Sequence, residues 1–147
     1  MSIVEITEFT VDLSEVADPL PLPVRTYPAT VIEAVPYLTK AGKVYVKVTY
    51  HIAPDVYPIE FDAENAPDGV KLTNYNNVDC GQPPAQPSKV GLARCRQLFD
   101  NHGVKIGSVT LRPRDEFASS WGLSDDVLAS LVGSRVNVAV LHDTYQG

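Results

Sequence analysis

The clearest pattern in the chain is the alternation of apolar and polar residues between positions 43 and 53. The apolar positions are Val44, Val46, Val48 and Ile52, and the polar positions are Lys43, Tyr45, Lys47, Thr49 and His51. Successive side chains of a strand point to opposite faces, so this segment is predicted to be a strand with one buried and one solvated face. Residues 27–38 predict a partner strand. Residues 39–42 form the turn between them, in which Gly42 can adopt a positive φ.

A third strand and a long loop are predicted after this hairpin. Residues 58–63 alternate, with Ile59, Phe61 and Ala63 expected to face inward. Residues 64–87 are rich in Asn, Gly and Pro. A connection of this length is typical of a functional loop or of a disordered segment, and both interpretations stay open.

Two helices are predicted in the C-terminal half. Residues 88–103 have helical spacing, with Ser88 as the cap and Gly103 at the stop. Their apolar stripe consists of Leu92, Cys95, Leu98 and Phe99. A shorter helix is predicted between Ser124 and Gly133, because the two aspartates after Ser124 suit a helix N-terminus.

The remaining segments complete a mainly β fold. Residues 104–112 are expected to form a weak strand or an irregular run, and residues 135–141 alternate as the closing strand. Strands with one or two short helices in this order predict a five-stranded Greek-key barrel of the OB type. We expect the OB-like domain to span residues 25–147.

The first 24 residues differ in composition from the rest. Residues 1–20 carry five acidic side chains and no Lys or Arg, whereas residues 21–147 are close to neutral, within a total net charge of −6. Asp18-Pro-Leu-Pro-Leu-Pro23 imposes an extended connector. The segment is predicted to add an edge strand or to be a mobile acidic arm.

The composition predicts a cytoplasmic protein with no membrane span. The apolar runs are far shorter than the roughly 20 residues needed to cross a bilayer, and no signal peptide is recognisable at the start. Two cysteines are too few for a disulfide framework, so both thiols are expected to be reduced.

The solvated face of residues 43–53 suggests a function. Lys43, Tyr45, Lys47 and Thr49 recur about 7 Å apart along one face of a strand. An aromatic ring can stack on a base while flanking lysines meet phosphates, and Lys40 in the turn extends this basic track. The alternative interpretation is an ordinary solvated strand face, where Lys and Tyr are common.

Two further groups of residues are candidates for the same interface. Lys71 and Tyr75 lie in the predicted 64–87 loop, where the alternative is a hydrogen-bonded turn cluster. Arg112, Arg114 and Trp121 lie in a second predicted loop, where Arg and Trp suit stacking and the alternative is a Trp that covers the barrel.

Motifs for catalysis are not recognisable in the sequence. The three histidines lack metal-ligand spacing, and neither a nucleophile elbow nor a P-loop is present. Cys80, Cys95 and His102 are the remaining metal candidates, but Cys95 fits a buried helical stripe, which favours a structural role. We expect no enzyme activity, no metal and no cofactor.

Several short motifs resemble those of phage-encoded single-stranded-DNA-binding proteins. They are Leu22-Pro23, Tyr27-Pro-Ala-Thr-Val-Ile-Glu-Ala34, Leu38-Thr-Lys-Ala-Gly-Lys43 and Leu131-Val-Gly-Ser-Arg-Val-Asn-Val138. The resemblance implies an OB fold and binding of single strands in phage replication or recombination, in the bacterial cytoplasm. Position by position, the resemblance extends only to the residues that lie in a matching motif, namely Lys40, Gly42, Lys43, Tyr45 and Lys47.

That family often ends in an acidic tail that recruits replication partners. Here either the sequence stops short of such a tail or the acidic N-terminal segment serves instead. The function expected is a non-catalytic protein that coats or protects single-stranded DNA, or RNA, with replication proteins and a second copy of the chain as further partners. The alternative is a protein-interaction or virion-component module on the same barrel, which does not bind nucleic acid.

Overall fold

The computed structural model describes residues 12, 14, 21–117 and 119–141 of the chain. Its fold is mainly β, as predicted. The strands are β1 (Thr26–Leu38), β2 (Val44–Ile52), β3 (Val70–Asn77), β4 (Leu111–Arg114), β5 (Ser120–Leu123) and β6 (Arg135–Ala139), and the helices are α1 (Lys89–Asn101) and α2 (Asp125–Ala129). Three short 3-10 turns, η2 (Pro54–Val56), η3 (Ala63–Asn65) and η4 (Asp115–Phe117), connect them.

Four strands form one antiparallel sheet in the order β3-β2-β1-β6, and β4 and β5 form a separate two-stranded sheet. Three consecutive strands with a fourth returning beside the first is the Greek-key arrangement. The long strand β1 pairs with β6 through its first half and with β2 through its second, with a bulge between Val31 and Glu33. Among the described residues the sheet does not close into a barrel, because β3 pairs only with β2 and β6 only with β1.

The predicted hairpin is confirmed. Gly42 has φ +78°, and its N–H donates to the carbonyl of Thr39 at 2.9 Å. The carbonyl of Lys43 in turn accepts from the N–H of Thr39. This turn sets the register of the two strands, with Leu38 opposite Val44 and Tyr37 opposite Tyr45.

The predicted strand at residues 58–63 is wrong. The segment contains turns instead, in which the Phe61 N–H donates to the Pro58 carbonyl and Ala63 begins η3. Pro58 has no N–H to offer a strand ladder, and of the three positions expected to face inward only Phe61 is buried. Ile59 is fully exposed.

The third strand lies instead within residues 64–87, where a loop was predicted. β3 pairs with β2 along its whole length, from Val70 opposite Ile52 to Asn77 opposite Tyr45. Its polar composition concealed it, because strands with high Asn content are uncommon. β3 is an edge strand among the described residues, so much of its surface is solvated.

Both predicted helices are confirmed. The Ser88 hydroxyl caps α1 by accepting from the Gly91 N–H at 3.1 Å. Cys95, Leu98 and Phe99 of the predicted stripe are buried, whereas Leu92 stays exposed. None of the described helices is long and apolar enough to cross a membrane.

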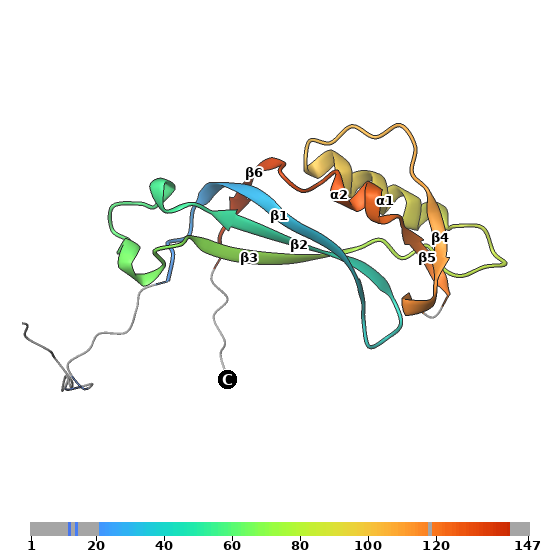
Figure 1. The fold of residues 1–147 in the computed structure, drawn as a ribbon, viewed down its shortest axis with the longest axis horizontal. Helices are drawn as coiled ribbons and strands as arrows, with labels where there is room; N and C mark the ends of the chain where they lie inside the picture. Colours follow the sequence, from blue (N-terminus) through green and yellow to red (C-terminus); the bar gives the residue numbers. More distant parts are fainter. Residues whose placement is uncertain (1–11, 13, 15–20, 118, 142–147) are drawn as a thin grey trace, which may run out of the picture.

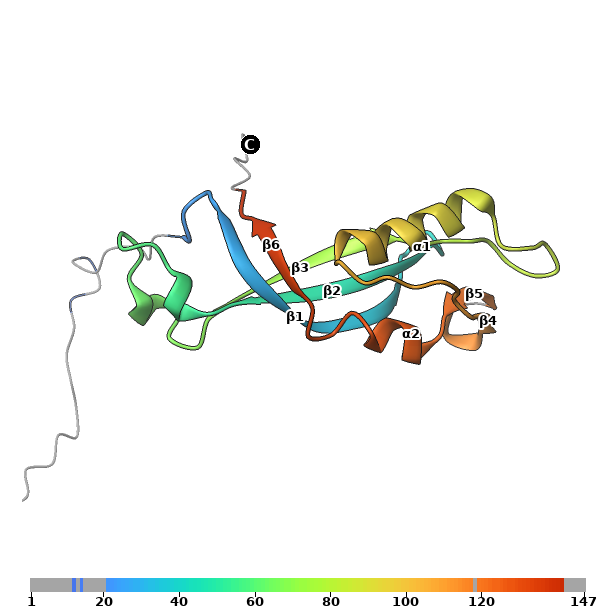
Figure 2. The same cartoon turned by 90° about the horizontal axis from the view of Figure 1, so that it is seen from above.

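The core lies between one face of the sheet and the two helices. Its centre is formed by the predicted inward residues of β2 together with side chains of α1, α2 and the turn after α2, namely Val44, Val46, Val48, Ile52, Leu98, Phe99, Leu128 and Leu131. α1 and α2 lie at one end of the long sheet, where β4 and β5 also lie (Figures 1 and 2). Leu22 of the connector packs into this core. Most of the acidic segment before it lies outside the described residues.

Candidate nucleic-acid interface

The sheet face opposite the core presents the residues that the sequence singled out on β2. We call it the outer face, and it carries Tyr45, Lys47, Thr49 and His51 of β2. The register places Asn77, Tyr75, Thr73 and Lys71 of β3 opposite these four residues in that order. On the other side of β2, β1 places Tyr37 opposite Tyr45, Val35 opposite Lys47 and Glu33 opposite Thr49. Lys71 and Tyr75 therefore join the predicted β2 track, but from a strand rather than from a loop.

Three tyrosines gather on this face, and we call Tyr37, Tyr45 and Tyr75 the aromatic patch. Tyr37 and Tyr75 are 44% and 49% exposed, so each offers about half of its surface to a ligand. Their ring centroids are 5.1 Å apart with planes tilted by 59°, so the two rings meet across β2. Tyr45 is half-buried directly opposite Tyr37. Side chains paired in this way lie within contact distance across a sheet.

Three lysines surround the patch. Lys47 lies on β2 between Val35 and Tyr75, and its Nζ is 3.7 Å from a Glu33 carboxylate oxygen. Lys43 lies at the start of β2 with its Nζ 3.9 Å from Asp79. Lys40 is exposed in the turn. Both ion pairs are partly solvated, and such pairs contribute about 1 kcal/mol or less, so a phosphate can compete for these lysines.

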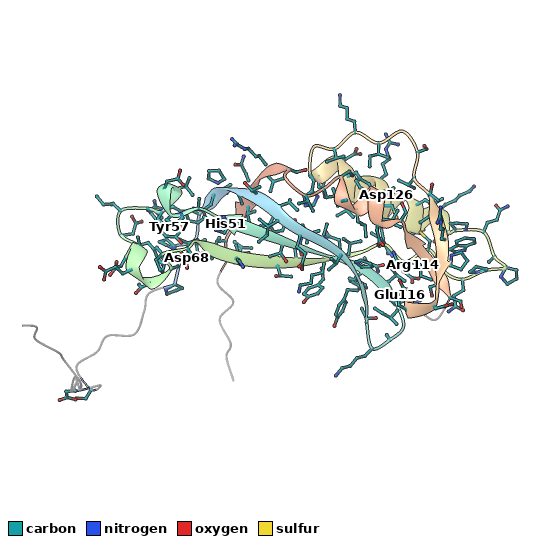
Figure 3. All side chains as sticks on the ribbon, in the orientation of Figure 1. His51, Tyr57, Asp68, Arg114, Glu116 and Asp126 are labelled. Carbon is teal, nitrogen blue, oxygen red and sulfur yellow. The ribbon has the colours of Figure 1, made fainter. Side chains whose placement is uncertain are left out.

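The far end of the outer face is held by a polar loop. Figure 3 shows His51 beside Asp68, and His51 Nε2 lies 2.7 Å from the carbonyl oxygen of Asp68. Lys71 is the exposed neighbour opposite His51. Gly69 has φ +102°, and a Cβ there would lie 2.1 Å from His51 Nε2. Only glycine therefore lets the loop approach His51 so closely.

Arg112, Arg114 and Trp121 lie on β4 and β5, so the second predicted loop is in fact a two-stranded sheet. Figure 3 shows Arg114 at the opposite end of the molecule from His51. Arg114 pairs with Glu116 and Asp125, and the hydrogen bond to Asp125 is the main reason that the pKa of Arg114 is raised. Trp121 packs against the core and donates from Nε1 to the Ala85 carbonyl at 2.9 Å. This anchored position matches the alternative role of a Trp that covers the core.

The three candidate metal residues do not form one site, because Cys80 and Cys95 contact the same carbonyl while His102 contacts a different side chain. The Cys80 and Cys95 thiols are buried and both point at the Val78 carbonyl, at 3.4 and 3.9 Å. The hydrogen bond to Cys80, together with burial, raises the pKa of Cys95. His102 instead bonds Tyr50. Within the described part of the chain, no group of three or more His, Cys, Asp or Glu side chains is arranged to hold a metal ion.

Tyr37 is the patch residue that the sequence reasoning missed. The predicted turn at residues 39–42 is one residue shorter than the five-residue connection that joins Leu38 to Val44, and this longer connection places Tyr37 opposite Tyr45. With this register the Tyr37 ring lies on the outer face, on the same side of the sheet as Tyr45.

We found no match to this chain among protein-family models, curated proteins or solved structures. The functional interpretation therefore depends on the geometry of the outer face.

Proposed function

We propose that the protein binds single-stranded nucleic acid on the outer face of β1, β2 and β3 without altering it chemically. The observation that carries this proposal is the aromatic patch, in which two half-exposed rings meet across β2 beside Lys47. Bases stack on Tyr37, Tyr45 and Tyr75 while the phosphates between them approach the surrounding lysines.

The energetics of stacking favour this ligand. Base–aromatic stacking contributes about 1–3 kcal/mol per base and tolerates any sequence, because every base has a π-face. A duplex keeps its bases stacked inside and leaves little for a tyrosine to contact. The aromatic patch therefore favours a single strand over a duplex.

The net charge of −6 weakens long-range attraction of a polyanion but does not decide local binding. Screening limits electrostatic influence to about 10 Å at moderate salt. Glu33 and Asp79 are acidic neighbours of the patch, and they already pair with Lys47 and Lys43. We expect binding that is modest in affinity and sensitive to salt.

The fold proposal follows the same reasoning. The Greek-key order, with α1 between β3 and the later strands, is compatible with an OB barrel that is open between β3 and β6. OB folds bind oligonucleotides on the face of their second and third strands. A role in phage replication or recombination, which the sequence motifs imply, belongs to this proposal.

A gel-shift titration at low salt tests the proposal. We expect a labelled oligo-dT of about 30 nucleotides to shift at micromolar protein, and the matching duplex to shift less. The absence of a shifted single strand at this concentration contradicts the proposal.

A second candidate function is a protein-interaction module that uses the same face. It is favoured by three exposed apolar side chains of β1 on or beside this face, namely Ile32, Val35 and Tyr37. Exposed apolar groups of this kind are typical of protein contact sites. This candidate predicts no shift with any oligonucleotide.

A further inference from the structure

A cleft of about 630 Å³ lies on the other side of β3 from the aromatic patch. β3, the C-terminal end of α1 and β6 form its walls. Its polar residues include Asn74, Asn76 and Asn101, and its apolar ones include Leu72, Val136 and Val138. Sites for small molecules commonly have volumes of about 300–1,000 Å³ and combine apolar walls with a few convergent polar groups.

Asn74 and Asn76 occupy positions of β3 where the strand pattern predicts apolar residues. The core-side positions of β2 are Val44, Val46, Val48, Tyr50 and Ile52. The matching positions of β3 change from Val70 and Leu72 to Asn74 and Asn76. Asn is disfavoured in strands, and polar residues at inward positions are unusual unless they serve a function.

The floor of the cleft is a fixed hydrogen-bond chain. His102 Nδ1 lies 2.7 Å from the Leu98 carbonyl, and its Nε2 lies 2.6 Å from the Tyr50 hydroxyl. A carbonyl only accepts, so Nδ1 carries a proton, and in the neutral ring with this tautomer Nε2 accepts from Tyr50. Burial raises the pKa of Tyr50, and the neighbouring Asn74 side chain partly offsets this rise. Both ring side chains are 7% exposed, which holds this floor in one arrangement.

The lining of the cleft contains His102 but no Lys or Arg among the described residues. A phosphate would therefore find no counter-charge there. The available groups are amides, each with one acceptor oxygen and two donor hydrogens. This chemistry suits a neutral planar ligand with donors and acceptors on its edge, and such a ligand is a nucleobase.

We propose that this cleft binds one base of the bound single strand, with adenine preferred, a proposal that rests on the proposed function. Asn pairs with adenine through two hydrogen bonds, one donated and one accepted. Tyr75 stands between Asn74 and Asn76 in β3. Its ring therefore lies on the outer face, while the side chains of the two asparagines line the cleft. A strand stacked on Tyr75 has only to pass the edge of β3 to place its next base in the cleft.

Titration of the full chain with dAMP, followed by NMR of the asparagine side-chain amides, tests the proposal. We expect dAMP to shift the amide signals of the three cleft asparagines, and dTMP to shift them less. The exposed pair Asn74→Ala and Asn101→Ala, combined, should weaken dAMP binding about fivefold or more, since one bidentate contact contributes about 1–3 kcal/mol. Asn65→Ala, exposed in η3, is the matched control and should change nothing.

The outcomes separate the cleft from the outer face. Unmoved asparagine amides at millimolar dAMP would overturn the cleft proposal, and so would an equal response to dAMP and dTMP. Contacts between these amides and residues 1–20 or a second copy in the free protein would also overturn it, because the cleft would then be filled. Binding of dAMP by a protein that does not bind oligo-dT supports the cleft and refutes the proposed function instead.

Discussion

Removing the Tyr75 ring is the sharpest perturbation of the aromatic patch. The side chain is 49% exposed on an edge strand, so Tyr75→Ala should cost little folding stability beyond its ring pair with Tyr37, about 0.5–1.5 kcal/mol. Loss of one stacked base removes about 1–3 kcal/mol of binding, which corresponds to roughly 5- to 150-fold in Kd. Fluorescence anisotropy of labelled oligo-dT measures this directly.

Tyr75→Phe is the matched control, because it keeps the ring and removes only the hydroxyl. We expect its Kd to stay within about twofold of the unaltered protein, since stacking needs the ring face alone. Ile59→Ala, a fully exposed apolar residue away from the patch, controls for non-specific surface effects. Equal affinity of the Ala and Phe variants would refute stacking on Tyr75.

Three further predictions follow from single side chains. Lys47→Gln should weaken binding of all sequences alike and lower the slope of log Kd against log salt by about one, whereas Lys105→Gln, on an exposed loop, should leave both unchanged. Leu131→Ala should lower the free energy of unfolding in urea by about 2–5 kcal/mol, because Leu131 is fully buried; Val132→Ala, at an exposed neighbour, should change it by less than about 0.5 kcal/mol. Burial raises the pKa of Tyr50 above its usual 10, so the neutral form is favoured in the folded state. The contribution of neutral Tyr50 to the free energy of unfolding should therefore be fully present below pH 10 and be lost as the pH rises through the raised pKa. Urea midpoints and tyrosinate absorbance, both measured at alkaline pH, would check this.

The sequence was informative wherever one face of an element is buried and the other is solvated. β2 and α1 carry their full periodicity in the chain, and the Gly42 turn fixed the register of the hairpin. α2 was equally recognisable from its first-turn aspartates. Each of these elements has a local pattern that agrees with its place in the fold.

The missed elements lack such a pattern. β3 is an edge strand whose inward positions include two asparagines of the cleft, so neither composition nor alternation marked it. Residues 58–63 alternate, but Pro58 and the single buried Phe61 fit turns. β4 and β5 are four residues each and depend on contacts far away in sequence, such as the Trp121 N–H bonded to the Gly81 carbonyl. For the site, the sequence named Tyr45, Lys47, Lys71 and Tyr75, but only the strand pairing showed that they share one face with Tyr37.

Mapping oligo-dT onto the protein by backbone amide shifts tests the central claim most directly. We expect the largest shifts on β1, β2 and β3 around Tyr37, Tyr45, Lys47 and Tyr75, at saturating ligand and low salt, with loss of the shifts as salt is raised. Shifts confined to β4 and β5, or their absence on the outer face at saturation, would contradict the assignment of this face as the binding surface.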